Sequence, residues 1–153
     1  MSRLELKIPP LVLAVITAAA MWVMSVGVEA LALDVPHHGR IALVFAALGL
    51  GVIVAGAVSF RAAQTTFDPR YPEPASSLVV AGVYRYTRNP MYLGMALALL
   101  AWAIFLAHAL AALLVAAFIV YMNRFQIGVE ERHLQQLFGA EYAAYTNKVR
   151  RWI

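Results

Sequence analysis

Three long apolar blocks, separated by short polar segments, dominate the chain. Residues 8–28 form a run of 21 residues without a charge, and residues 41–60 form a run of 20 in which Ser59 is the only clearly polar side chain. At a rise of 1.5 Å per residue, about 20 helical residues cross the hydrocarbon layer of a bilayer, which is roughly 30 Å thick. Each of these two blocks therefore predicts one transmembrane helix.

The third block, residues 91–122, is longer than one crossing requires. Its 32 residues are interrupted only by His108. As a single helix they would extend about 48 Å, which one span accommodates only with extreme tilt. A helical hairpin that turns at His108, within residues 105–109, removes this mismatch. The pattern therefore predicts an all-α fold, a polytopic membrane bundle of about four transmembrane helices with an amphipathic C-terminal tail.

The same pattern divides one membrane domain, residues 1–153, into four parts. We expect an N-terminal helical hairpin over residues 1–60, a polar loop over 61–90, a second hairpin over 91–126 and a cytoplasmic tail over 127–153. The loop is too rich in proline for a continuous helix; its prolines are Pro69, Pro72, Pro74 and Pro90. In the first hairpin a stripe of small residues at four-residue spacing favours close helix packing in lipid. The stripe consists of Ala47, Gly51 and Ala55.

The composition supports lipid as the surrounding solvent. The chain is 63% hydrophobic and 13% charged, whereas a typical soluble domain is roughly 25% charged. A soluble fold of this size could not bury so much apolar surface. The absence of cysteine excludes disulfides and zinc–thiolate sites, and no metal site is predicted. The first block follows Arg3 and Lys7 as a signal peptide would, but it exceeds the length of a signal core, so we interpret it as a retained anchor.

The basic residues predict an orientation. With four crossings, eleven of the twelve Lys and Arg residues fall on one side of the membrane, and only Arg40 falls on the other. Cytoplasmic loops carry such an excess of basic residues, so both termini are predicted to be cytoplasmic. The net charge of +4 therefore indicates contact with membrane lipids, including anionic ones, and not with nucleic acid.

The first stretch with candidate chemistry is residues 82–94. Asn89 followed by Pro90 is a typical helix start, with Asn at the N-cap and Pro in the first turn. The N-terminus of a membrane-buried helix presents free N–H groups and a partial positive charge, which suit an anionic group. Arg85 and Arg88 flank this position. The same residues also fit a plain helix cap with topology-setting arginines, and both interpretations remain open at this point.

The second stretch is residues 123–145. A seven-residue step makes about two turns of an α-helix, so Arg124 is predicted to share a face with Glu131, and Asn123 with Glu130. An apolar stripe continues beyond them through Leu134, Leu137 and Phe138. Gly139 then suits the end of the helix. An acidic pair at the membrane border is either a solvated helix face or a cation site.

The ordered motifs resemble a known group of enzymes. Tyr-x-x-x-Arg-Asn-Pro-x-Tyr-x-Gly over residues 84–94, then Glu130-Glu131, then Phe-Gly-x-x-Tyr-x-x-Tyr over residues 138–145 is similar to the superfamily of isoprenylcysteine carboxyl methyltransferases and phospholipid N-methyltransferases. The similarity covers residues 81–153. It implies a helical membrane bundle whose C-terminal part wraps S-adenosylmethionine at the cytosolic face. It also implies methyl transfer to a lipophilic acceptor.

The resemblance assigns roles to individual residues. It implies that one wall of the cofactor site consists of Tyr84, Arg88, Asn89, Pro90, Tyr92 and Gly94, and aromatic faces in this wall can steady the cofactor's sulfonium. Glu130 and Glu131 match the acidic pair, one member of which holds the cationic methionine part of the cofactor. Arg124 matches the arginine that orients the anionic group of the substrate, and it is the predicted catalytic residue.

The acceptor and two other functions stay open. Asn89 stands where the carboxyl methyltransferases usually have histidine, whereas phospholipid N-methyltransferases more often show asparagine. The acceptor is therefore an isoprenylcysteine-type carboxylate, a phospholipid amine or a similar lipophilic molecule. Membrane steroid-reductase-like proteins that use NADPH share the Arg-Asn-Pro-x-Tyr-x-Gly segment. A non-catalytic scaffold or small transporter is the other alternative, although the spans contain few of the ionisable residues that transport requires. The oligomeric state is left open.

Overall fold

The computed structural model describes residues 7–63 and 77–153, and it is helical throughout. The elements are α1 (Pro10–Gly27), η1 (Glu29–Leu31), α2 (His38–Ala62), η2 (Gly82–Arg85), α3 (Pro90–Leu106), α4 (Ala109–Tyr121), η3 (Met122–Ile127) and α5 (Gly128–Thr146). Within these ranges there is no β-strand, only an isolated bridge between Ala32 and His108. The predicted all-α fold is confirmed. Arg3 and the loop prolines Pro69, Pro72 and Pro74 lie outside the described residues.

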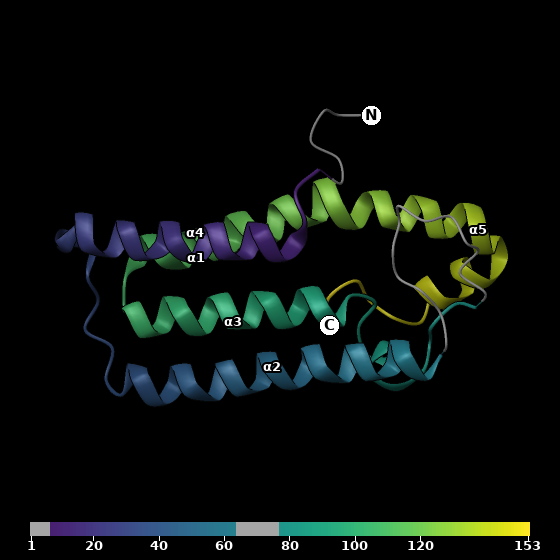
Figure 1. Cartoon of the computed structure of the whole chain (residues 1–153), viewed down its shortest axis with the longest axis horizontal. Helices are drawn as coiled ribbons and strands as arrows, with labels where there is room; N and C mark the ends of the chain where they lie inside the picture. The colour runs from purple at the N-terminus through teal and green to yellow at the C-terminus, as the bar shows by residue number, and fades with distance from the viewer. Residues whose placement is uncertain (1–6, 64–76) are drawn as a thin grey trace.

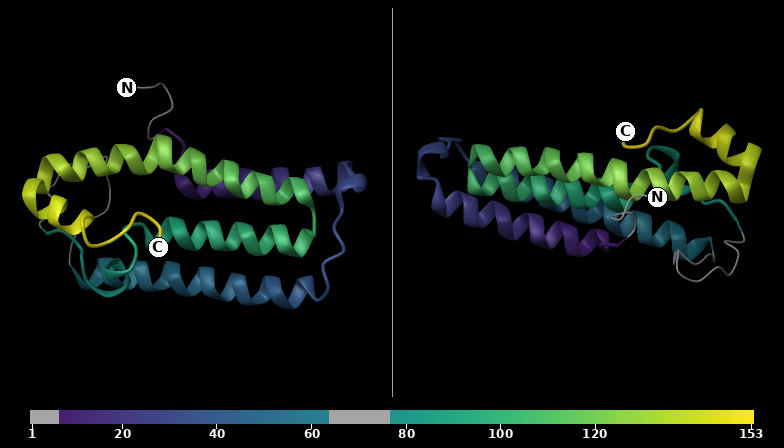
Figure 2. Two further views of the ribbon diagram at one scale, coloured as in Figure 1. Left: turned by 180° about the vertical axis from the view of Figure 1, so that it is seen from behind. Right: turned by 90° about the horizontal axis from the view of Figure 1, so that it is seen from above.

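The long helices run side by side along the long axis of the molecule, with α3 at the centre (Figure 1). α2 packs against one side of α3, and α1 packs against α4 and α3 on the other side. Figure 2 shows the same layers from behind and from above. The expected N-terminal hairpin is therefore not a packed pair, because α3 lies between α1 and α2. Helices that are adjacent in the chain are separated in space when a later helix offers the better contact surface.

Glycines set the contact between α2 and α3. A Cβ atom added to Gly94 would lie 2.6 Å from the carbonyl oxygen of Gly49 and would also collide with Ile53. Such a close approach of two backbones is the role that small residues have in membrane bundles. The predicted stripe through Gly51 does not take part in this contact: among the described residues nothing lies within 4 Å of a Cβ built at Gly51. The stripe lines an open apolar groove on the side of α2 away from α3.

The α3–α4 turn lies where the sequence predicted it. α3 ends at Leu106, Ala107 adopts a left-handed conformation with φ of 46°, and His108 precedes α4. The His108 side chain is 2% exposed, and its Nε2 donates a 2.8 Å hydrogen bond to the carbonyl oxygen of Val28. The Leu33 amide donates to the Ala107 carbonyl. These bonds tie the α1–α2 connection to the α3–α4 turn, so His108 has a structural role there.

Among the residues that the structure describes, three helices are long and apolar enough to cross a membrane. They are Pro10–Gly27, His38–Ala62 and the continuous helix Ala109–Thr146, while α3 is apolar but shorter, with 17 residues. Large apolar side chains on the outer surface are well exposed, among them Leu11 at 64% and Leu43 at 71%. Exposing so much apolar area to water would cost considerable free energy. The chain is therefore an integral membrane protein, and its described residues form a bundle of four long helices in which α1 and α3 run opposite to α2 and α4 (Figure 1).

Candidate functional site

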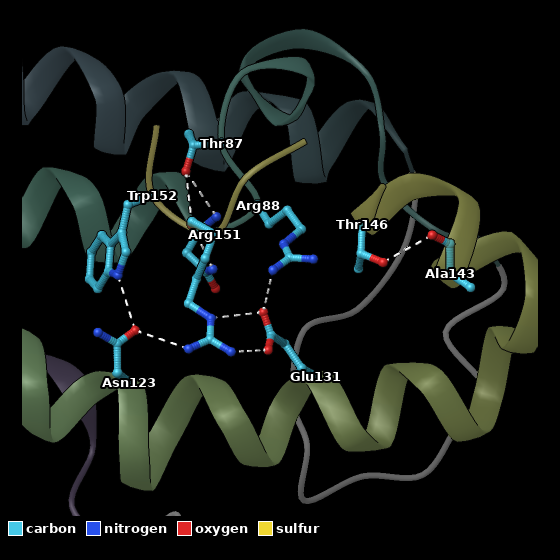
Figure 3. A network of polar contacts seen from close by, with 9 residues as sticks. Thr87, Arg88, Asn123, Glu131, Ala143, Thr146, Arg151 and Trp152 are labelled. Carbon is cyan, nitrogen blue, oxygen red and sulfur yellow. Dashed lines mark hydrogen bonds and ion pairs between the residues drawn. The ribbon is translucent and has the colours of Figure 1, made fainter. Parts of the chain in front are cut away.

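Polar side chains gather at the end of the bundle opposite the α3–α4 turn. Three segments meet there: residues 84–92 at the start of α3, residues 123–131 where η3 leads into α5, and the C-terminal strap, which we define as residues 147–153 (Figure 3). Two carboxylates occupy the centre of this site, Glu130 and Glu131. Each carboxylate has its own set of partners.

Glu130 is held by neutral donors. The hydroxyl of Tyr92 donates a 2.7 Å hydrogen bond to Oε1 of Glu130, and Nε2 of Gln126 donates a 2.6 Å bond to the same oxygen. Gln126 is only 7% exposed. Both bonds use Oε1, and in the described part of the chain no bond to Oε2 is found. Glu130 is therefore oriented by its neighbours without a positive partner of its own.

Glu131 is held by two guanidinium groups. Nη2 of Arg88 lies 2.9 Å from Oε1 of Glu131, and Arg151 donates to both carboxylate oxygens, with a 3.1 Å bond from Nε. The Glu131 carboxylate raises the pKa of Arg151 above its ordinary value through these hydrogen bonds. Two cations around one anion neutralise Glu131 and leave a net positive charge beside it.

A π-helical turn explains why Arg124 is not among these partners. η3 winds residues Met122–Ile127 with i to i+5 hydrogen bonding, which takes up an extra residue in the turn. The predicted common face of Arg124 and Glu131 was wrong, because a seven-residue step describes an uninterrupted α-helix. Asn123, and not Arg124, shares a partner with Glu131. Its Oδ1 accepts a 3.4 Å bond from Arg151, the residue that also binds Glu131. The Arg124 side chain is exposed, and its guanidinium lies 5.7 Å from the ring centroid of Phe125.

The start of α3 differs from the prediction in one respect. Asn89 and Pro90 do occupy the N-cap and the first turn, but the Asn89 side chain makes no capping bond. Its Nδ2 instead donates a 3.0 Å hydrogen bond to the carbonyl oxygen of Arg151 in the strap. Thr87, which is 2% exposed, donates to the same carbonyl. The Asn89 side chain thus binds the C-terminus of the chain, a partner that local sequence could not indicate.

The remaining predicted wall residues divide between the site and the scaffold. Tyr84 is buried; its ring meets Phe60 edge-on with centroids 5.3 Å apart, and its carbonyl accepts a 2.7 Å bond from the Tyr145 hydroxyl. Burial raises the pKa of the Tyr84 phenol above its ordinary value, with smaller contributions from Tyr145 and Glu130, so the hydroxyl stays protonated. Gly94 faces α2 and Pro90 lies beside Gly56 of α2, so these two residues serve helix packing.

Gly139 interrupts α5 with a backbone conformation that favours glycine. The predicted helix end there is a kink, with φ of 49° and ψ of −117°, after which helical residues continue to Thr146. A positive φ is a conformation that glycine adopts without steric cost. The kink turns the end of α5 back toward the bundle, which lets the strap return to the start of α3 (Figure 1).

The site offers matched groups for a zwitterion. Nε of Arg88 is buried and has no hydrogen-bond partner among the described residues. Buried donors are nearly always paired, so this N–H is suited to an acceptor supplied by a ligand. Glu130 can accept from a cation while Arg88 donates to an anion. The α-amino acid part of the expected cofactor carries one group of each kind, so the residues present fit it.

Sequence reasoning missed three polar residues of this site, Gln126, Arg151 and Trp152. Nε1 of Trp152 donates a 3.0 Å bond to Oδ1 of Asn123. Gln126 stands four residues before Glu130, a spacing that places two residues on one helix face, so a signal for it existed. No comparable signal existed for Arg151, because its contacts depend on the path of the strap.

Comparison with known proteins gives two matches. The family model described as phospholipid methyltransferase matches residues 39–141, a segment that contains the start of α3 and the acidic pair. An uncharacterized protein of Haemophilus influenzae (strain ATCC 51907 / DSM 11121 / KW20 / Rd) is 51% identical over 63 residues, which represent 41% of this chain and 100% of that protein. No solved structure matches the chain.

Proposed function

Because its family model matches residues 39–141, this chain belongs to the phospholipid methyltransferase family, and we propose that it uses S-adenosylmethionine to methylate a lipophilic acceptor at the cytoplasmic membrane face. The membership agrees with the resemblance read from the ordered motifs of residues 84–145. Glu130 carries the proposal: it is oriented by Tyr92 and Gln126. The next residue, Glu131, pairs with Arg88, whose Nε lacks a partner in the described part of the chain.

The two glutamates have different proposed roles. Glu130 holds the ammonium of the cofactor's methionine part, because its bonds come from neutral donors and leave its charge available. Glu131 is already neutralised by Arg88 and Arg151, so a third cation would gain little there. Its role is to align Arg88, whose free N–H meets the carboxylate of the same methionine part. A charge-assisted bond at each end fixes the cofactor's orientation.

Methyl transfer demands geometry more than acid–base chemistry. S-adenosylmethionine supplies an electrophilic methyl group on a sulfonium. The buried aromatic residues Tyr84 and Tyr92 line the approach to Glu130, and their faces can steady a cation. Their neutral hydroxyls and the apolar core around them exclude water, and orientation in a desolvated site accelerates an in-line displacement. The protein's contribution is therefore alignment of donor and acceptor.

The acceptor is proposed to approach from the lipid. Arg124 is exposed where the apolar helix α4 has just ended, next to the aromatic side chains of Phe125 and Tyr121. Aromatic and arginine residues at such a border contact lipid headgroups. We assign Arg124 to the anionic group of the acceptor, either an isoprenylcysteine-type carboxylate or the phosphate of a phospholipid whose amine is methylated. For an amine acceptor, the nitrogen must lose a proton before it attacks.

The orientation in the membrane is part of the proposal. The end of the bundle that carries the site holds most of the described basic side chains, including Arg61, Arg85, Arg124 and Arg132, whereas Arg40 stands at the opposite end. This distribution supports a cytoplasmic site and two cytoplasmic termini. Reporter fusions at the C-terminus and at Gly39 should give opposite signals, and equal signals would contradict the four-crossing arrangement.

Titration of the purified protein in detergent or nanodiscs with S-adenosylhomocysteine tests the cofactor. We expect binding with micromolar-scale affinity by calorimetry, and no binding of NADPH under the same conditions. Tight binding of NADPH without S-adenosylhomocysteine would favour the reductase alternative. A direct assay with radiolabelled S-adenosylmethionine and total membrane lipids would then identify the acceptor class from the labelled product.

A further inference from the structure

We propose that the C-terminal strap is a latch over the candidate site, and that Arg151 is the positioning residue that holds the latch closed. Opening of the strap would then set the rate at which the cofactor enters and leaves. This inference rests on the proposed function, because it concerns traffic to the same site. It adds a moving part to a site otherwise built on helices.

The strap connects the two walls of the site. On one wall, the Arg88 amide donates a 3.1 Å bond to the Arg150 carbonyl, and the Asn89 side chain donates to the Arg151 carbonyl. On the other wall, the Arg151 guanidinium binds Glu131 and Asn123. Figure 3 shows Arg151 between the two walls, with its backbone near Thr87 and its side chain directed at α5. A ligand between Arg88 and Glu130 therefore lies next to the strap.

The strap is suited to move independently of the bundle. It lies outside the helices, and segments that lack regular backbone hydrogen bonding open at a lower free energy than the packed core. Its attachments include the hydrogen bonds above, the Arg151–Glu131 ion pair, the bond from Trp152 to Asn123, the partly buried Trp152 ring against the core and the buried Val149 side chain. The glycine contact between α2 and α3 and the bonds of His108 do not involve the strap. Detaching residues 147–153 therefore leaves the transmembrane scaffold intact.

Two consecutive arginines in the strap differ sharply in their side-chain contacts. The Arg151 side chain binds Glu131 with two nitrogens, and it is a planar fork that matches a carboxylate. The Arg150 side chain is exposed. Both residues contribute a carbonyl to the bonds with residues 87–89, so only their side chains distinguish them. Changing each arginine to glutamine removes the same charge from neighbouring positions and provides a matched pair.

The closed strap also helps to align the Arg88 side chain. Glu131 binds Arg88 and Arg151 together, so closing of the strap completes the set of partners that holds Arg88 in place. When Arg151 leaves, Glu131 loses one of its two cationic partners, and Arg88 is held less firmly in its aligned position. The closed strap thus both covers the site and supports the guanidinium proposed to meet the cofactor's carboxylate.

The experiment measures strap opening and cofactor release in the full-length protein in nanodiscs. Stopped-flow displacement of bound S-adenosylhomocysteine gives the dissociation rate for wild type, Arg151→Gln, Arg151→Lys and Arg150→Gln. Hydrogen exchange over residues 84–90 and 147–153, without ligand, reports strap opening, because the Arg88 amide is protected by the Arg150 carbonyl. Circular dichroism of each variant verifies the helical fold.

We expect Arg151→Gln to raise the dissociation rate roughly tenfold or more, as for the loss of a charge-assisted bond, and to raise exchange in both segments. Arg151→Lys should restore part of the effect, because lysine keeps the charge but not the fork. Arg150→Gln should match wild type. Trp152→Phe, which removes the bond to Asn123 and keeps the aromatic bulk, should shift release in the same direction by less.

Equal dissociation rates in Arg151→Gln and Arg150→Gln would overturn the latch, even if exchange rises in the strap. If both variants release the ligand faster than wild type by the same factor, the cause is the loss of net charge and not the contact between Arg151 and Glu131. If wild type itself binds no S-adenosylhomocysteine, the proposed function fails, and the latch fails with it. These outcomes separate the two proposals.

Discussion

The two ends of the bundle are closed in opposite ways. At the turn end, ring and amide N–H groups donate to backbone carbonyls: His108 donates to Val28, Leu33 donates to Ala107, and His38 donates a 2.9 Å bond to Phe105. At the site end, carboxylates meet guanidinium groups, as in the contacts of Glu131. The four helices are common to both ends, so the difference lies in the connecting segments.

This contrast assigns a structural role to the turn end and agrees with the binding role proposed for the site end. Hydrogen bonds to backbone carbonyls satisfy groups that would otherwise be orphaned, and they need no ligand. Partly buried ion pairs add little net stability, because desolvation offsets the Coulombic attraction. The ion pairs at the site end are therefore better explained by the proposed binding of a charged ligand than by a contribution to stability. The predictions below test this division between a neutral scaffold and a charged site.

The largest effect is expected for Gly94→Val, which challenges the scaffold. The new side chain would meet the Gly49 carbonyl and Ile53, and overpacking of this kind should cost about 3 kcal/mol in unfolding free energy, the upper part of its usual range. Thermal unfolding in detergent measures it. The matched control is Gly51→Val, where nothing lies within 4 Å of the new Cβ. Equal unfolding temperatures for the two variants would refute the glycine contact.

The next effect concerns the charged site. Glu130→Gln should weaken S-adenosylhomocysteine binding about ten- to a hundredfold, which corresponds to roughly 1.5–3 kcal/mol for a lost charge-assisted bond. The melting temperature without ligand should barely change. Calorimetric titration measures the affinity, with Glu141→Gln on the exposed face of α5 as the control. Unchanged affinity in folded Glu130→Gln protein would falsify the assignment of the cation to Glu130.

A smaller effect is expected at the turn end. His108→Ala leaves the Val28 carbonyl without its donor and should lower the unfolding free energy by about 1–2 kcal/mol. Cofactor affinity should stay at the wild-type value, because the turn and the site lie at opposite ends. Thermal unfolding and titration of one sample measure both quantities, with His133→Ala on the exposed surface as the control. A loss of affinity without a loss of stability would contradict the division between the ends.

The smallest change in stability is expected for Arg124→Ala. An exposed substitution usually stays within about 0.5 kcal/mol, and cofactor affinity should be spared because Arg124 contacts Phe125 and not the acidic pair. Turnover should fall on the order of tenfold, as for one lost charge-assisted contact to the acceptor. The control is Arg85→Ala, an exposed arginine at the same end. Turnover equal to that of the control would remove Arg124 from the reaction.

The number of helices and the position of one turn could be predicted from the amino-acid pattern. Apolar block lengths predicted four helices, and the excess length of residues 91–122 placed the turn at His108, because helix rise and bilayer thickness leave few other solutions. The ordered motifs also indicated the family, and they located Tyr92 and Glu130 on segments that meet in space. These properties depend on local pattern and on the membrane, which act on every helix alike.

The assembly of the site depends on tertiary contacts that the amino-acid pattern does not indicate. The π-turn at η3 shifts the helical phase, so that Asn123 takes the place expected for Arg124 beside Glu131. The kink at Gly139 returns the strap to the start of α3, which brings Arg151 to a glutamate 20 residues earlier in the chain. Neither event leaves a periodic signal, because one extra residue in a turn and the path of a chain end depend on contacts between distant segments.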